Sequence, residues 1–129
     1  MSNEKDIIEK IINRPEGYKK ERADCTVVAL SLVLNISYIE AHTTLKENGR
    51  KNNKGFRCKK NIAKVFSSRG IEVKQVKRSG SVISLLKKYP QGRLFCIKRA
   101  HAFAVIDGIA HNLNASEHSH IKGAWLVKG

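Results

Sequence analysis

The sequence predicts an α+β domain in which N-terminal helices pack on a C-terminal antiparallel sheet. Three observations predict it. Apolar residues recur at helical spacing up to Gly70, they alternate or form short runs after it, and an Asp-Gly turn joins two of those runs. The chain has 129 residues, of which 41% are apolar, so we expect one domain over residues 1–129.

Two helices are expected before residue 35. Residues 4–13 carry four isoleucines at helical spacing, ahead of a proline and a glycine that would end the helix. Asp24 is a good N-cap for residues 25–34. Because those residues are apolar nearly all round, this second helix should be the buried one.

Three more helices are expected. A capping box, Ser37-Tyr-Ile-Glu40, opens the first of them, which should end at Glu47. Residues 50–57 are interpreted as a basic loop, and residues 59–68 have apolar residues at helical spacing. Residues 81–88 are expected to form a short helix.

Strand patterns fill the rest of the chain. Residues 71–76 alternate between apolar and polar, and four short apolar runs follow, at residues 94–97, 101–106, 109–114 and 124–127. Asp107-Gly108 is the strongest two-residue hairpin signal in the sequence, and it should join the second and third runs as antiparallel strands.

Cys25 stands at the start of the expected buried helix. Free backbone N–H groups and the helix dipole favour a thiolate there, although the neighbouring Asp24 carboxylate opposes it. An activated thiol therefore needs a partner base, and His101 is the leading candidate.

The expected hairpin places amide side chains beside this histidine. With a two-residue turn, His101 lies opposite Asn114 and diagonal to Asn112, on a face shared with Phe103. Either amide could orient the imidazole, whereas His111 points to the other face.

Four segments resemble papain-like cysteine peptidases. Asp24-Cys-Thr-Val-Val-Ala-Leu30, followed by Ser37-Tyr-Ile-Glu-Ala-His42, resembles the nucleophile helix of that superfamily. Residues 100–112 resemble its histidine hairpin, and Ile121-Lys-Gly-Ala-Trp125 resembles its final strand. The resemblance is closest to small peptidase-like proteins common in bacteriophage genomes, and more distant to bacteriocin-processing peptidases.

The resemblance implies a papain-like fold in which the helix carrying Cys25 packs on the sheet carrying His101. It implies that Cys25 is the nucleophile and His101 the general base, and Asn112 stands where the orienting Asn or Asp belongs. The expected activity is that of an intracellular, phage-type hydrolase that cleaves a peptide, isopeptide or amide bond through a Cys25 thioester, with no cofactor.

The sequence departs from the family pattern at two places. Lys19 and Lys20 stand where papain-like enzymes have a Gln that donates to the oxyanion, so the oxyanion hole would depend on the Cys25 backbone N–H and another donor. Thr26 replaces the Gly that commonly follows the cysteine in bacteriocin-processing relatives. A catalytically weak or inactive member of the fold is therefore the alternative.

The net charge of +14 is concentrated in one segment. Residues 50–100 contain sixteen Lys and Arg but one acid, a net of +15, whereas the flanking segments are nearly neutral. This segment predicts a polyanion partner, namely nucleic acid, a ribosome or an acidic host protein, or else only a solvated surface. Nucleic-acid motifs are absent and aromatic residues are only 6%. The binding residues proposed on this basis are Lys51, Lys54, Arg57, Lys59 and Lys60.

The remaining cysteines and histidines are assigned structural roles. Cys96 is expected in the core and Cys58 in the basic loop as an exposed thiol. His42 is expected on a helix surface. His118 and His120, with His111 nearby, form a weak zinc pattern that lacks suitable Cys or carboxylate ligands, so we expect no metal.

Other features favour a cytoplasmic protein. The first six residues are polar and no apolar run approaches the roughly 18 residues of a membrane span. Three cysteines, an odd number, fit a reducing compartment. We expect a monomer, located in the host cytoplasm if phage-encoded, that acts on a peptide or protein substrate and does not bind a membrane.

Overall fold

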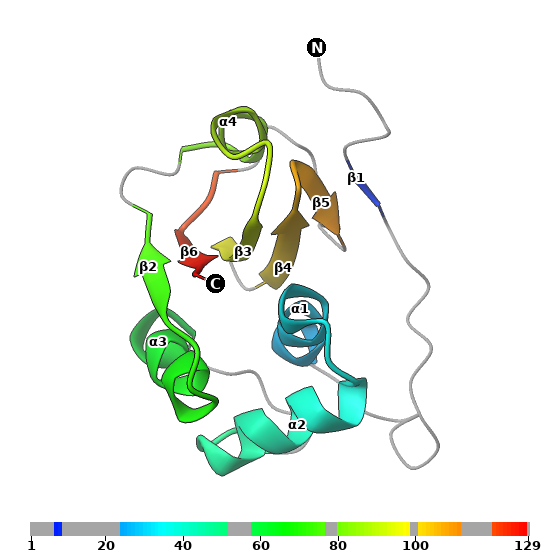
Figure 1. Ribbon diagram of the computed structural model, residues 1–129, viewed down its shortest axis with the longest axis vertical. Coiled ribbons are helices and arrows are strands. Elements are labelled where there is room, and N and C mark those ends of the chain that lie inside the picture. The colour runs from blue at the N-terminus through cyan, green and yellow to red at the C-terminus, as the bar shows by residue number, and fades with distance from the viewer. Residues whose placement is uncertain are drawn as a thin grey trace.

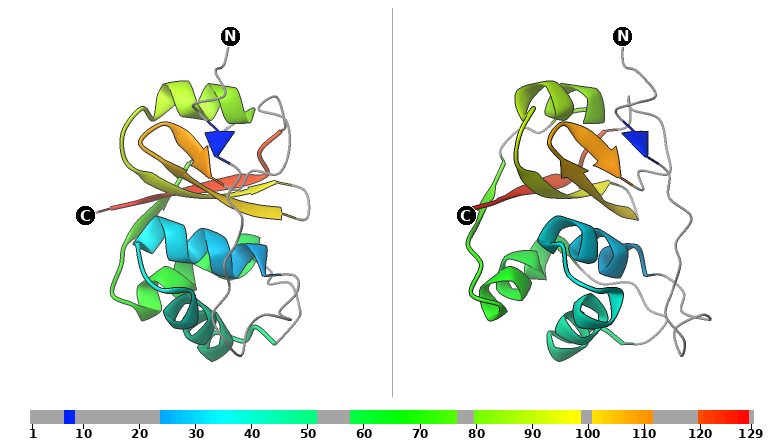
Figure 2. Two further views of the ribbon diagram at one scale, coloured as in Figure 1. Left: turned by 90° about the vertical axis from the view of Figure 1, so that its right-hand side faces the viewer. Right: turned by 45° about the vertical axis from the view of Figure 1, so that its right-hand side comes forward.

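A computed structural model describes residues 7–8, 24–51, 58–76, 80–98, 101–111 and 120–128. They form an α+β arrangement of three layers, in which helices α1, α2 and α3 lie on one face of a sheet and α4 lies on the other (Figure 1, Figure 2). The described helices are α1 (Cys25–Leu34), α2 (Tyr38–Glu47), α3 (Cys58–Ser68) and α4 (Val82–Lys88).

These four helices confirm the expected ones to within a residue. Ser37 and Ser81 each accept a hydrogen bond from the backbone N–H three residues later, as N-caps do. Helix α4 begins one residue later than expected, and α3 begins one residue earlier, at Cys58, which removes Cys58 from the expected basic loop. Its side chain is not among those described.

The sheet has the strand order β1-β5-β4-β3-β6-β2. Its strands are β1 (Ile7–Ile8), β2 (Val73–Gln75), β3 (Arg93–Lys98), β4 (His101–Ile106), β5 (Ile109–His111) and β6 (Gly123–Val127). Strands β2 to β6 pair antiparallel, as expected. In the β4–β5 hairpin Ile106 pairs with Ile109 across Asp107-Gly108, which confirms the two-residue turn.

The helix expected over residues 4–13 is wrong at Ile7 and Ile8. These residues form β1, which pairs parallel with Ala110 and His111 of β5. Isoleucine is β-branched and favours strands, and the outer edge of β5 offers backbone groups to pair with. The rest of that expected helix lies outside the described residues.

Two apolar cores lie on the two faces of the sheet. The lower core lies between the sheet and helices α1 to α3, and it contains Phe95 and Ala102. The upper core lies between the sheet and α4, and it contains Phe103 and Cys96. Cys96 is fully buried, as expected. Alternate residues of β3 and β4 therefore face opposite cores.

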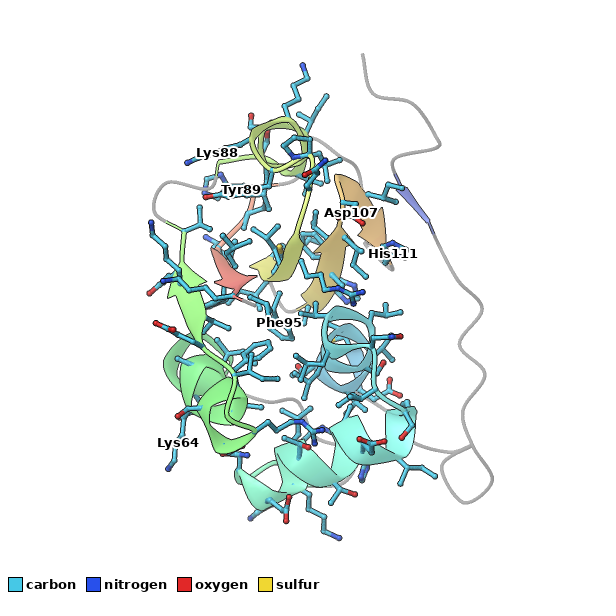
Figure 3. All side chains as sticks on the ribbon, in the orientation of Figure 1. Lys64, Lys88, Tyr89, Phe95, Asp107 and His111 are labelled. Atoms are coloured by element: carbon cyan, nitrogen blue, oxygen red, sulfur yellow. The ribbon has the colours of Figure 1, made fainter. Side chains whose placement is uncertain are left out.

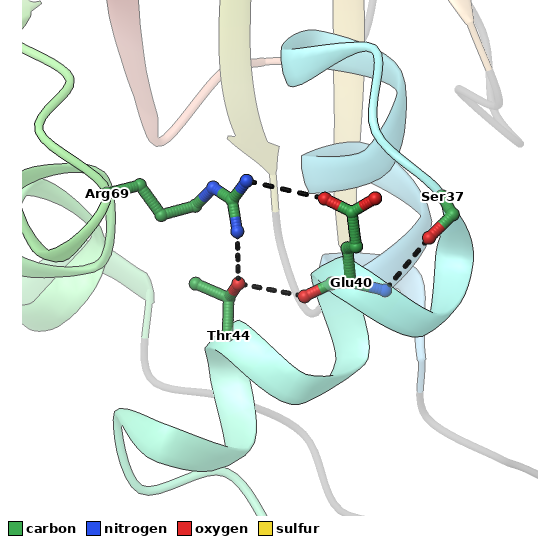
Figure 4. Close-up of polar contacts among 4 residues, drawn as sticks. All are labelled: Ser37, Glu40, Thr44 and Arg69. Atoms are coloured by element: carbon green, nitrogen blue, oxygen red, sulfur yellow. Dashed lines mark hydrogen bonds and ion pairs between the residues drawn. The ribbon is translucent and has the colours of Figure 1, made fainter.

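Arg69 is one of the side chains that link α2 to α3 (Figure 4). Arg69, just after α3, donates to Thr44 Oγ1 at 3.0 Å and lies 3.4 Å from a Glu40 carboxylate oxygen. The expected surface position of His42 is wrong, because His42 is 4% exposed. His42 is one of the buried residues of α2, with its neighbour Ala41. Which side of the helix is buried depends on how α2 packs against distant parts of the chain.

Within the described residues, no single helix is long and apolar enough to cross a membrane; α1 and α2 meet that test only as a pair bent by 115°.

Candidate thiol site

Cys25 is the first residue of α1, and the start of this helix lies beside the start of β4. The helix begins where Val28 donates its N–H to the Asp24 carbonyl oxygen at 3.0 Å. Ala102 and Ala104 are the β4 residues in the lower core, which α1 contacts. Because their side chains are small, the helix can approach the strand closely.

Two groups of β4 contact the Cys25 sulfur. The backbone N–H of Ala102 donates to Sγ at 3.4 Å. The His101 side chain also forms a hydrogen bond with the thiol. The structure therefore brings together the two residues that the sequence predicts as nucleophile and base, and both are half-buried.

These contacts set the protonation of Cys25. Burial is the largest single effect and raises the pKa of the thiol. Hydrogen bonds with His101, the Ala102 N–H and Thr26, together with the charge that His101 can carry, act in the opposite direction. Their sum holds the pKa of Cys25 below its ordinary value, so the thiolate is favoured although the group is largely shielded from water.

His101 contacts Cys25 although the expected strand alternation assigns it to the same face as Phe103. Phe103 lies in the upper core, whereas His101 bonds to Cys25, which packs against the lower core. His101 is the first residue of β4, so it has a strand neighbour after it but none before it. The predicted orienting residues, Asn112 and Asn114, lie outside the described residues.

His111 is on the α1 side of the sheet. It pairs with Ala104, which lies in the lower core, and Figure 3 shows it at the end of β5 on the side nearer α1. The expected hairpin register placed His111 and His101 on opposite faces of the sheet. His111 therefore lies on the face of the sheet that α1 covers, and His101 contacts Cys25 from the start of β4.

Asp24 occupies the N-cap position of α1, but its side chain makes no capping hydrogen bond. One of its carboxylate oxygens accepts a hydrogen bond from the Tyr38 hydroxyl at 2.7 Å, and Asp24 is only 5% exposed. Sequence reasoning missed Tyr38 because its partner is 14 residues away and on another helix. The only signal was a tyrosine at the first turn of an adjacent helix.

Of the proposed binding residues, only Lys51 has a described side chain. Lys51 is exposed, and Lys59 and Lys60 lie on α3 with side chains that are not described. Lys54 and Arg57 lie outside the described residues.

Two further lysines lie near the thiol site. Lys98 pairs with His101 across β3 and β4. The backbone N–H of Lys122 donates to the carbonyl oxygen of Ile97 at 2.8 Å, which puts Lys122 at the same end of the sheet. Only the strand register could have identified them.

Other features of the described surface are separate from the thiol. A hollow of about 560 Å³ between α2 and α3 includes Asn48 and Arg69, and one of about 360 Å³ between α3 and β2 includes Ile71. Neither is lined by Cys25 or His101. Among the described residues, no group of three His, Cys, Asp or Glu side chains could hold a metal ion.

Comparison with known proteins identifies no relative. No protein-family model, no curated protein and no solved structure matches the chain. The residues around Cys25 therefore carry the functional proposal.

Proposed function

We propose that this chain is a papain-like thiol hydrolase that cleaves a peptide, isopeptide or amide bond. The observation that carries the proposal is the contact of Cys25 with His101 at the start of α1, where the pKa of a largely buried thiol is lowered rather than raised. A buried cysteine without such partners shows the opposite shift, as Cys96 does.

The reaction would follow the chemistry of an activated thiol. The Cys25 thiolate attacks the carbonyl carbon, and the oxygen takes the negative charge while backbone N–H groups at the start of α1 stabilise it. The C–N bond then breaks, His101 donates its proton to the leaving amine, and a thioester remains on Cys25. His101 next accepts a proton from water, whose oxygen attacks the thioester and releases the acid.

The test is the rate of alkylation of each cysteine by iodoacetamide, followed by peptide mapping between pH 5 and 9. We expect Cys25 to react at a pH below the ordinary thiol range, and His101→Gln to move its profile to higher pH. Cys96 in the same sample is the internal control for a buried thiol. Alkylation of Cys25 no faster than that of Cys58 or Cys96 would contradict the proposal.

We also propose that the basic segment recruits a polyanionic partner to this site. The observation that favours it is the position of Lys98, from this segment, at the His101 end of the sheet, where Lys122 from outside the segment also lies. Like charges placed close together repel each other, and a bound anion would relieve that repulsion.

Heparin and duplex DNA are suitable probes of this second function. Binding should weaken steeply with salt, because neutralised phosphates or sulfates release counterions. Lys98→Gln with Lys122→Gln should weaken it more than the matched pair Lys87→Gln with Lys88→Gln on α4. Cys25→Ala should abolish hydrolysis and leave this binding intact. Retention that is independent of salt, or equal effects of the two lysine pairs, would contradict recruitment to this site.

A further inference from the structure

Strand β2 is at one end of the sheet, and within the described part of the chain its outer edge is unpaired. It pairs with β6 on one side, and no described strand lies beyond it. Figure 1 shows β2 at this end of the sheet, next to α3. An unpaired edge presents backbone N–H and C=O groups to which a further extended chain can bond.

The register shows which backbone groups of β2 face outward. Glu72 and Val76 each form a backbone hydrogen bond with β6 or the residue after it, at 2.9 Å and 2.8 Å. In an antiparallel pair, such contacts recur at every second residue. The N–H and C=O groups of Val73 and Gln75 therefore point away from β6, and no described group bonds to them.

The hollow of about 360 Å³ lies next to this edge. It is lined by residues of α3, among them Ala63, and by the segment that leads into β2, including Ile71 and Val73. Both Ile71 and Val73 pack against the lower core, so the hollow is on that face of the sheet. A residue of an added strand opposite Val73 would share this face, and its side chain would lie over the hollow.

The other face of β2 carries a positive charge. Lys74 alternates with Val73 and is exposed. Glu72, two residues before it, forms an ion pair with Lys128 at 3.8 Å. Opposite charges on neighbouring strands stabilise a sheet, and like charges destabilise it. An acidic residue is therefore favoured opposite Lys74 on an added strand.

We propose that the outer edge of β2 and the adjoining hollow bind an extended acidic peptide of a partner protein as a further strand. The peptide backbone would bond with Val73 and Gln75, an apolar side chain would enter the hollow, and an acidic side chain would lie opposite Lys74. A second copy of the chain fits less well, because each copy has a net charge of +14 and would bring its own lysine to the edge. Strands β6 and β3 separate this edge from β4, so the site is independent of the proposed hydrolase.

The first experiment compares two labelled peptides by fluorescence anisotropy. Thr-Glu-Val-Glu-Val-Thr alternates acidic and apolar residues, and Thr-Glu-Glu-Val-Val-Thr has the same composition without the alternation. We expect the alternating peptide to bind more tightly and to slow hydrogen exchange of the Val73 and Gln75 amides more than that of the Lys74 amide, which faces β6. Equal binding of the two peptides would mean attraction by net charge alone and would overturn the proposal.

The second experiment alters the edge and the hollow separately. Gln75→Pro removes an outward N–H and leaves the hydrogen bonds with β6 in place, so it should weaken binding of the alternating peptide about two- to tenfold, the size of one hydrogen bond. Ala63→Gln, which fills the hollow from α3, should also weaken it. Lys64→Arg, at a neighbouring exposed position that does not line the hollow, should not. Unchanged affinity in either of the first two variants would contradict the site.

A charge exchange tests the same contact without altering the backbone. Lys74→Glu should weaken binding of the alternating acidic peptide about two- to fivefold and strengthen binding of Thr-Lys-Val-Lys-Val-Thr. Lys87→Glu on α4 changes the net charge equally and should have smaller effects on both peptides. Equal effects of the two substitutions would assign the binding to net charge. A dimer of the peptide-free protein in sedimentation, dissociated by Gln75→Pro, would place a second copy at this edge and overturn the proposal.

Discussion

Cys25 is half-buried and Cys96 is fully buried, and their surroundings move the pKa values of the two thiols in opposite directions. Cys96 lies in the upper core and burial alone raises the pKa of its thiol far above the ordinary range. Burial acts on Cys25 in the same sense, but hydrogen bonds with His101 and the Ala102 N–H outweigh it. The difference arises from polar partners that only one of the two sites contains.

This contrast predicts opposite pH dependences of stability. In the unfolded chain both thiols ionise near pH 8.5. Cys25 ionises at lower pH in the folded state, so its contribution to stability is present above about pH 8.5 and is lost as the pH falls through the lowered folded pKa. Cys96 stays protonated when folded, so its contribution declines above about pH 8.5 by about 1.4 kcal/mol per pH unit.

Urea unfolding of Cys25→Ala and Cys96→Ala against the unsubstituted protein, from pH 6 to 10, measures both effects. The difference in free energy of unfolding between the unsubstituted protein and Cys96→Ala should decrease above about pH 8.5. The corresponding difference for Cys25→Ala should increase as the pH rises toward that value. Cys58 is present in all three proteins, so its contribution to the free energy of unfolding cancels. Parallel curves for the two variants would contradict the opposite shifts.

Residue roles were predictable where the chemistry is local. The Ser37 cap follows from residue type and position in the helix. The long-range contact of Cys25 with His101 could be anticipated only because an activated thiol needs a base. The roles of Asp24 and His42 were not predictable in the same way, because each depends on a residue or helix elsewhere in the fold. A capping propensity is worth about 1 kcal/mol, which one strong hydrogen bond from Tyr38 can outweigh.

At the scale of elements, the β4–β5 turn combines two unusual backbone conformations. Asp107 and Gly108 have φ of +50° and +77°, as a type I′ hairpin turn requires. The turn is also fastened to the residue before β3, since Asp107 donates its N–H to the Gly92 carbonyl at 2.8 Å and accepts from the Gly92 N–H at 3.0 Å. This tie helps to fix the register that brings His101 to Cys25.

Gly108→Ala should therefore destabilise the hairpin. An alanine at this position would keep an unfavourable positive φ, and its Cβ would lie 3.4 Å from Pro90 backbone atoms. We expect a loss of about 1–2 kcal/mol in urea unfolding. Gly70→Ala, at φ of +72° with no atom within 4 Å of the added Cβ, is the control for backbone strain alone. A loss no larger than that of Gly70→Ala would show that the contact with Pro90 is relieved without cost.

Gly123 in β6 tests the packing of the lower core instead of backbone conformation. A Cβ at this position would lie 2.8 Å and 3.0 Å from two ring carbons of Trp125 and 3.3 Å from Ile97. Gly123→Ala should cost about 1–3 kcal/mol, as overpacked sites do. In Trp125→Phe, which lacks those ring carbons, the same substitution should cost less, and a double-mutant cycle in urea measures the difference. An unchanged cost would assign the effect to Ile97.

The elements themselves were largely predictable because most have both a pattern and a stop signal. Helices α1 to α4 and strands β3 and β4 lie close to their expected positions. Strand β1 was not predictable, because Ile7 and Ile8 fit a helical stripe and a strand equally well. Its partner, β5, lies about a hundred residues further along the chain, and the exposed edge that decides the conformation exists only in the assembled sheet.

At the scale of the whole molecule, charge and chemistry come from different parts of the chain. Cys25 and His101 lie in nearly neutral segments, and the sixteen Lys and Arg of residues 50–100 lie in the connection between them. The fold does not keep them apart, because β3 from the basic segment pairs with β4 and places Lys98 opposite His101. Sequence composition could show that the segment is basic, but only the sheet order shows which of its residues lie near the thiol.

The same excess of charge should limit the stability of the folded state. A net charge of +14 on 129 residues produces self-repulsion that compaction increases, and salt shortens the range of that repulsion from about 30 Å at 0.01 M to about 8 Å at 0.15 M. We expect Tm to rise by a few °C over this range, equivalent to about 1 kcal/mol. Lys87→Glu with Lys88→Glu, on exposed positions of α4 away from the thiol, should reduce the rise because it removes four units of net charge. A Tm that falls with salt in the unsubstituted protein would instead mean that ion pairs such as Arg69 with Glu40 outweigh the repulsion.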